Sequence, residues 1–93
     1  MAVYVDPPRS LYRGQLFCHV WADTIDELHA AAAAAGLKRS WFQEPPHASW
    51  PHYDCGGRIR ARLVANGAIE TDLRAPVRHR YAWLADRNNC ENS

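Results

Sequence analysis

LFCHVWADTIDELHAAAAAAGL, residues 16–37, contains the signals of a strand and of a helix in direct succession. The first six residues are almost continuously apolar, which predicts a strand covered on both faces. Thr24 opens a capping box, in which its hydroxyl accepts from the third helical amide and the glutamate three positions later reaches back to the cap. Gly36 supplies the left-handed residue that commonly ends a helix. We therefore predict a strand over residues 16–21 and a helix over residues 24–35.

Weaker signals extend this pattern in both directions along the chain. We expect strands over residues 2–5, 40–43 and 68–72, a second helix over 58–66, a short third helix from Pro76, and loops over 6–14 and 44–51. Strands that alternate with helices are typical of a parallel sheet. The prediction is one small α/β domain over residues 1–87, with a short, mostly parallel sheet of about four strands and two or three helices. Residues 88–93 are predicted to be a disordered tail.

The composition is that of an ordinary globular protein. The chain has 93 residues, 47% of them hydrophobic and 23% charged, which fits one domain with a single core. No apolar stretch is long enough for a membrane helix, and the formal net charge of +1 gives no global attraction to nucleic acid. The three cysteines lack C-x-x-C spacing, which argues against a disulfide framework and a zinc ribbon. We therefore expect a cytoplasmic protein.

Polar residues follow the predicted strands, at Asp6, Asp23, Gln43 and Asp72. The carboxyl ends of parallel strands meet at one edge of a sheet, where ligands bind, so these four side chains are expected to line that edge. Asp6 and Asp23 could act as an acid and a base, or hold Mg²⁺. The alternatives are turn chemistry for Asp6 and favourable charge at a helix N-terminus for Asp23.

A second candidate group combines imidazoles with a carboxylate: His19, His29, His52 and Asp54. Such groups ligate transition metals and exchange protons near neutral pH. No H-x-x-x-H or H-E-x-x-H spacing is present, so the identity of any metal or cofactor stays open. The structural alternative is that His19 is a hydrogen-bonded core histidine and that His29 anchors the first helix. Asp54 could cap the second helix or orient the His52 imidazole.

A third group contains basic and aromatic side chains around the second helix. Arg39 and Arg58 are candidates to bind a phosphate, and Trp50 and Tyr53 are candidates to stack on a ligand. The alternatives are a solvated basic helix face and aromatic side chains that complete the core. The arginine-rich residues 74–87 could follow a phosphate backbone or form an amphipathic closing helix.

Four short segments form a recognisable set: Val3-Tyr-Val-Asp6, Cys18-His-Val-Trp-Ala-Asp23, Asp26-Glu-Leu-His29, and His52-Tyr-Asp54 with Gly67-Ala68 downstream. With these segments, residues 1–72 resemble a bacterial and phage family catalogued as domain of unknown function 4031. The resemblance implies an actinobacterial or actinophage setting, in the cytoplasm of a bacterium or of an infected host. It implies no particular activity.

These groups together predict a polar site at the carboxyl edge of the sheet. The leading hypothesis is a domain that binds a small phosphorylated ligand or nucleotide, with its hydrolysis, and hence enzyme activity, left open. The expected catalytic residues are Asp6, His19, His52 and Asp54, and the expected ligand-binding residues are Arg39, Arg58, Trp50 and Tyr53. The alternative is a non-enzymatic adaptor that binds a host protein or nucleic acid through Trp50 and the arginine-rich C-terminal half. A concave polar pocket favours the first hypothesis, and a flat exposed patch favours the second.

Overall fold

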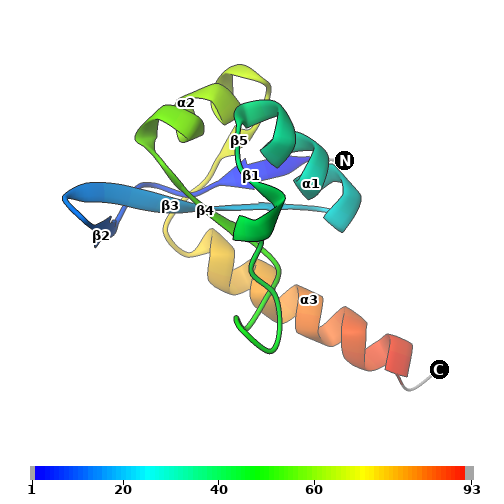
Figure 1. Cartoon of the computed structure of the whole chain (residues 1–93). Coiled ribbons are helices and arrows are strands. Elements are labelled where there is room, and N and C mark those ends of the chain that lie inside the picture. Colours follow the sequence, from blue (N-terminus) through cyan, green and yellow to red (C-terminus); the bar gives the residue numbers. More distant parts are fainter. Residues whose placement is uncertain (1, 92–93) are drawn as a thin grey trace.

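Figure 1 shows the chain as a computed structural model, which describes residues 2–91. Its elements are β1 (Val3–Val5), β2 (Ser10–Tyr12), β3 (Gln15–Ala22), α1 (Ile25–Ala35), η1 (Arg39–Trp41), β4 (Tyr53–Gly56), α2 (Gly57–Ala65), β5 (Ile69–Glu70) and α3 (Ala75–Glu91). The fold is therefore a small α/β domain, as the sequence predicts. None of the helices in this part of the chain combines the length and the apolar character that a membrane crossing needs.

The longest strand, β3, is the centre of the sheet. Val20 of β3 lies opposite both Val5 of β1 and Tyr53 of β4, so these two strands flank β3 on opposite sides. β2 pairs with the beginning of β3, and β5 pairs with the outer side of β1. Within residues 2–91, the three pairs that involve β3 are antiparallel, and the β1–β5 pair is parallel.

The prediction of a mostly parallel sheet is therefore wrong. Two short strands, β2 and β4, were not predicted. β2 lies within residues 6–14, which were expected to form a loop, and it turns directly into β3. β4 occupies residues 53–56, which were expected to lead into the second helix. Antiparallel strands can pair without a helical crossover between them. Because β2 and β4 were missed, the remaining strands alternated with helices and led to the prediction of too many parallel pairs.

The strand expected over residues 40–43 is also wrong. A single 3₁₀ turn, η1, covers the beginning of this segment. Only Gln43 pairs like a strand residue, in an isolated antiparallel bridge with His52 in which both N–H···O distances are 2.9 Å. Pro45 and Pro46 follow soon after, and proline has no amide hydrogen to donate to a ladder.

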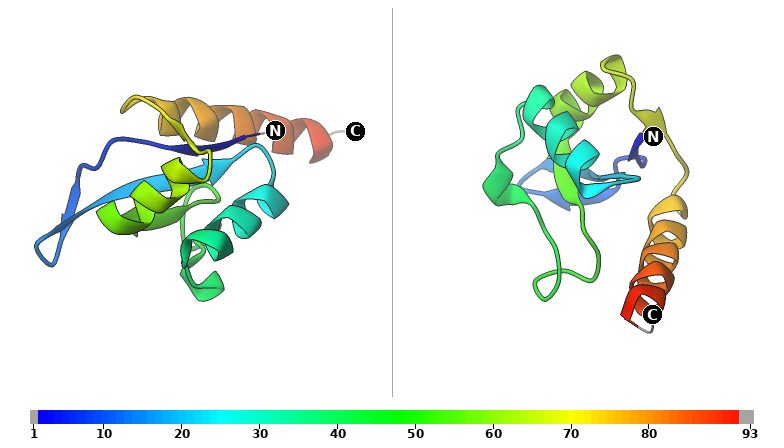
Figure 2. Two further views of the ribbon diagram at one scale, coloured as in Figure 1. Left: turned by 90° about the horizontal axis from the view of Figure 1, so that it is seen from above. Right: turned by 90° about the vertical axis from the view of Figure 1, so that its right-hand side faces the viewer.

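Side chains alternate along β3 and give the sheet two different faces. Cys18, Val20 and Ala22 are buried against α1 and α2, whereas His19 and Trp21 point to the opposite face. Figures 1 and 2 show α1 and α2 on one side of the sheet and α3 on the other. The core on the helical side also contains Val5, Leu28, Ala32, Ala35, Leu37, Tyr53, Cys55 and Leu63.

The first helix is confirmed in position and in both of its ends. The Thr24 hydroxyl accepts from the Glu27 backbone N–H at 3.2 Å and donates to the Glu27 carboxylate at 2.9 Å. Gly36 ends the helix with φ at 97°, in the left-handed region. The capping box therefore has the structural role that its sequence predicts.

Replacing Thr24 with alanine should lower the free energy of unfolding by about 1 kcal/mol, because the helix loses its N-terminal acceptor. Urea denaturation monitored by circular dichroism measures this loss. Thr24→Ser is the matched control and should stay close to wild type, since serine keeps the hydroxyl acceptor. Equal losses in the two variants would show that the hydroxyl does not stabilise the helix.

The third helix is longer than the sequence indicates. A short helix was expected from Pro76, but α3 covers Ala75–Glu91. The His79 ring lies 6.0 Å from that of Trp21 and 5.7 Å from that of Trp50, so the beginning of α3 covers part of the face opposite α1 and α2. Of the expected disordered tail, residues 88–91 belong to α3, and residues 92 and 93 lie outside the described residues. The domain boundary at residue 87 therefore stays a prediction.

Candidate metal centre

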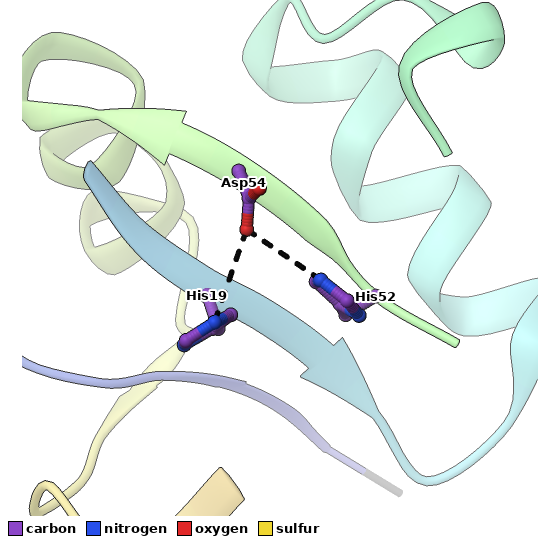
Figure 3. Close-up of side chains that lie close together, drawn as sticks. All are labelled: His19, His52 and Asp54. Atoms are coloured by element: carbon purple, nitrogen blue, oxygen red, sulfur yellow. Dashed lines mark ion pairs between the residues drawn. The ribbon is translucent and has the colours of Figure 1, made fainter. Parts of the chain in front are cut away.

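Three polar side chains meet on the sheet face that α1 and α2 leave uncovered (Figure 3). His19 of β3 lies directly opposite Asp54 of β4 in the antiparallel ladder. His52 precedes Asp54 by two positions, so its side chain emerges on the same face. Asp54 Oδ1 lies 3.6 Å from His52 Nε2 and 4.0 Å from His19 Nε2. One donor atom from each residue lies within 4.8 Å of the other two.

Asp6, directly after β1, holds His19 in place. The Asp6 side chain is 1% exposed. Its Oδ1 accepts from the His19 backbone N–H at 2.6 Å, and its Oδ2 accepts from His19 Nδ1 at 2.8 Å. A carboxylate only accepts, so Nδ1 of His19 donates in this hydrogen bond, and Nε2 is the ring nitrogen that faces Asp54. The hydrogen bond to Asp6 also raises the pKa of the His19 imidazole, against the opposing effect of burial.

A backbone carbonyl holds the second imidazole in the same way. His52 Nδ1 lies 2.9 Å from the carbonyl oxygen of Trp50. Because a carbonyl accepts and cannot donate, the proton is on Nδ1, and Nε2 of His52 is again the free atom. His52 is buried, and burial lowers the pKa of its imidazole. Burial favours the neutral ring, and it outweighs the hydrogen bond to the Trp50 carbonyl, which raises the pKa.

The carboxylate of the trio is oriented by an amide. Gln43 Nε2 donates to Asp54 Oδ2 at 2.7 Å, which leaves Oδ1 to face the two histidines. The backbone bridge between Gln43 and His52 places this amide beside the site. The Gln43–His52 bridge therefore helps to position both His52 and, through the Gln43 amide, Asp54.

This arrangement fits a transition-metal ion. Each of the three side chains is fixed by a hydrogen bond at the atom that faces away from the site, and outer partners of this kind set the tautomer and orientation of metal ligands. Two imidazoles and one carboxylate suit zinc or ferrous iron and leave positions open for water or ligand. Donor atoms around such an ion lie about 3.4 Å apart, so small side-chain movements would close the present spacing.

Aromatic rings surround the two histidines. The Trp50 ring stacks on that of His52 with centroids 4.3 Å apart, and it lies 5.6 Å from that of His19. Trp21 and His79 pack against Trp50, and these three rings form an aromatic wall beside His19 and His52. Burial lowers the pKa of His79. Trp50 is only 7% exposed. Trp50 therefore does not form an exposed aromatic patch, and the adaptor hypothesis stays a prediction.

Two hollows lead from the surface to the site. The smaller, of about 460 Å³, is lined by His19 and Asp54 together with residues of the β2–β3 hairpin. The larger, of about 940 Å³, lies between β4, α2 and the same hairpin, and Asp54 and Arg58 are among its lining residues. Asp54 borders both hollows, so a ligand in either one can contact the carboxylate of the trio.

The structure brings most of the expected site residues together. The four expected catalytic residues converge, Trp50 forms the wall beside them, and Arg58 lines the larger hollow. Tyr53 and Arg39 are placed elsewhere. Tyr53 is buried in the core on the opposite face of the sheet. The Arg39 guanidinium lies over the Phe42 ring, 5.0 Å from its centroid.

Other candidates have structural roles. His29 Nδ1 lies 2.9 Å from the Tyr53 hydroxyl, in the part of the molecule that contains the core, so His29 anchors α1 as the structural alternative proposed. Asp54 does not cap the second helix, because α2 begins after Gly56 without a side-chain cap. Its role toward His52 is the one that the geometry supports.

The expected row of polar residues at one sheet edge is wrong. β1 and β3 run antiparallel, so Asp6 and Asp23 follow their strands at opposite ends of the pair. Asp23 accepts from the Ala2 backbone N–H at 2.8 Å and from the Tyr4 hydroxyl at 2.9 Å, and it ties down the beginning of β1. Asp72 pairs with Arg78. Asp6 and Asp23 therefore cannot share a magnesium ion or act as an acid–base pair.

The sequence interpretation missed three contributors: the orienting role of Gln43, the carbonyl of Trp50 and the ring of His79. From its position in the sequence, Gln43 is only a residue at a strand end. Its partner Asp54 could be inferred only after the Gln43–His52 bridge and the β3–β4 register were known. No local pattern in the sequence signals either pairing.

Comparisons with known proteins bear on the family of the chain. No curated protein and no solved structure matches it. A family model described as protein of unknown function (DUF4031) matches residues 3–82. The match extends beyond the resemblance over residues 1–72 and includes the beginning of α3. The chain therefore belongs to the DUF4031 family.

Proposed function

We propose that this protein binds one divalent transition-metal ion through His19, His52 and Asp54 and uses the ion to hold a small phosphorylated ligand. One observation carries the proposal: three separate hydrogen bonds fix the three side chains so that Nε2, Nε2 and Oδ1 face one another. A random surface cluster has no reason to have all three outer atoms occupied.

The donor set points to the class of metal. Imidazole nitrogen suits zinc, iron, nickel and copper, whereas magnesium and calcium prefer oxygen ligands. Three protein ligands leave at least one open position, where water or a phosphate oxygen can bind. A metal-bound water becomes more acidic and can act as a nucleophile, which is the route by which such a centre would support hydrolysis.

Wild-type protein, first treated with a chelator, should bind one equivalent of Zn²⁺ in isothermal titration calorimetry. His52→Ala and Asp54→Asn should each weaken this binding by more than about 100-fold, because even the loss of an outer partner costs about 10–100-fold. His47→Ala is the matched control, since His47 is an exposed histidine outside the cluster. We expect its zinc affinity to equal that of wild type.

Two results of this titration would contradict the proposal. The first is a wild-type protein that binds no zinc. The second is an equal loss of affinity in His47→Ala and His52→Ala, which would indicate nonspecific histidine binding. Affinity should also fall below neutral pH, because a metal binds only the neutral imidazole.

A further inference from the structure

The larger hollow beside the candidate centre is strongly basic. Arg13, Arg58 and Arg62 line it, and Asp54 is the carboxylate in its lining. Arg13 lies on the β2–β3 turn, and Arg58 and Arg62 lie four positions apart on α2, so the guanidinium groups reach the hollow from two sides. This charge balance favours an anion, and guanidinium groups are well suited to phosphate.

Two of these arginines have no carboxylate partner within the hollow. The salt bridges in the described part of the chain involve neither Arg13 nor Arg58. Arg62 is partly engaged, since its Nη1 donates to the Ala35 carbonyl at 3.4 Å. Arg13 and Arg58 are therefore the groups available for an anionic ligand.

The backbone of Arg13 gives a second, independent observation. Arg13 and Gly14 form a two-residue turn between the paired residues Tyr12 and Gln15. Both turn residues have positive φ, at 51° for Arg13 and 75° for Gly14. Such turns strongly favour asparagine or glycine at the first position, and arginine is strained there. Strained backbone is common at binding sites, so the strain at Arg13 beside the hollow supports a binding role for its side chain.

Aromatic rings add an apolar surface to the same hollow. Tyr12, Phe17 and Trp41 line it, and Tyr12 and Trp41 are 60% and 47% exposed. Tyr12 and Phe17 also border the smaller hollow next to His19. Planar groups such as nucleic-acid bases stack on rings of this kind.

We infer that the hollow binds a nucleoside monophosphate, with its phosphate between Arg13 and Arg58 near Asp54 and its base against the aromatic rings. This inference rests on the proposed function in one respect only, because the metal would contact the phosphate from the Asp54 side. The arginines and the aromatic rings line the hollow without any contribution from the metal.

Isothermal titration with adenosine 5′-monophosphate, adenosine and inorganic phosphate tests the inference, with apo and zinc-loaded protein. The monophosphate should bind more tightly than either of its parts, and more tightly to the zinc-loaded form. Arg13→Asn and Arg58→Gln should each weaken its binding by about 10-fold or more, since each removes a charge-assisted hydrogen bond. Arg9→Gln is the control, because Arg9 is exposed and does not line the hollow.

Arg13→Asn also has a readout that a structural role would not produce. Asparagine tolerates positive φ, so the midpoint of urea unfolding should stay the same or rise while nucleotide binding falls. A lower midpoint together with unchanged binding would overturn the role of Arg13.

The outcomes separate the two proposals. If wild type binds zinc but not the monophosphate, the inference is wrong and the metal proposal stands. If wild type binds no zinc but the apo form binds the monophosphate through Arg13 and Arg58, the metal proposal is wrong and the nucleotide site stands. Binding of a short single-stranded RNA without binding of the monophosphate would overturn the small-ligand assignment in favour of a nucleic-acid surface.

Discussion

Asp6→Asn should weaken zinc binding by about 10–100-fold although Asp6 would not touch the metal. The amide introduced by this substitution can place an N–H where the carboxylate Oδ2 accepted from His19 Nδ1. The imidazole would then accept at Nδ1 and carry its proton on Nε2, which is the atom needed as a ligand. Zinc titration measures the loss, and ¹⁵N NMR of the ring reports the change of tautomer.

The stability of Asp6 variants separates this positioning role from a purely structural one. Asp6→Ala leaves the His19 backbone N–H without its acceptor and should cost about 1–3 kcal/mol of unfolding free energy. Asp6→Asn keeps an oxygen for that N–H and should lose less stability than Asp6→Ala, yet still lose zinc affinity. Asp26→Asn, which neutralises an exposed carboxylate on α1, is the control for loss of charge and should keep full zinc affinity. Wild-type affinity in Asp6→Asn would show that Asp6 only stabilises the fold.

Leu63→Ala should be among the most destabilising single changes, with a loss of about 2–5 kcal/mol. Leu63 is 1% exposed and belongs to the core cluster between the sheet and the helices α1 and α2. Domains of this kind have about 5–15 kcal/mol of stability in total, so this single change would remove a large fraction of it. Thermal and urea denaturation measure the effect.

Leu11→Ala is the matched control for the core prediction, because Leu11 is 72% exposed on β2. Its unfolding midpoint should stay near that of wild type. Saturating zinc should raise the midpoint of Leu63→Ala, since a ligand that binds only the folded state stabilises it. If Leu63→Ala and Leu11→Ala lose equal stability, the helical side of the sheet is not the principal core.

Local signals predicted the parts of the fold that are determined locally. The helix α1 depends on contacts within a few positions, from Thr24 to Glu27 and from Gly36 back to Ala32, and it was predicted with both ends correct. The direction of the strands depends on pairings between distant residues. The segment Tyr53–Gly56 has four residues between a proline-rich loop and a helix, too few to show the alternation that identifies a strand.

The proximity of the four expected catalytic residues was predicted, but for an incorrect reason. Asp6, His19, His52 and Asp54 were expected together because the carboxyl ends of parallel strands share an edge. They meet instead because His19 faces Asp54 across the β3–β4 ladder and Asp6 continues the neighbouring strand. The ligand-binding role expected for Tyr53 could not be judged from sequence, since the face to which a strand residue points depends on a register that the sequence does not reveal.

Cys18–Cys55 and His19–Asp54 are successive residue pairs of the β3–β4 ladder, and their side chains point to opposite faces of the sheet. This placement has a consequence for folding specificity. A shift of β4 by one residue against β3 would turn the Asp54 carboxylate into the apolar layer and the Cys55 thiol out toward the histidines. Burying an unpaired carboxylate costs several kcal/mol, so this competing register is strongly disfavoured. The side chains that would serve the metal thus also protect the sheet from a misaligned alternative, and neutral replacements at position 54 should allow more heterogeneous pairing.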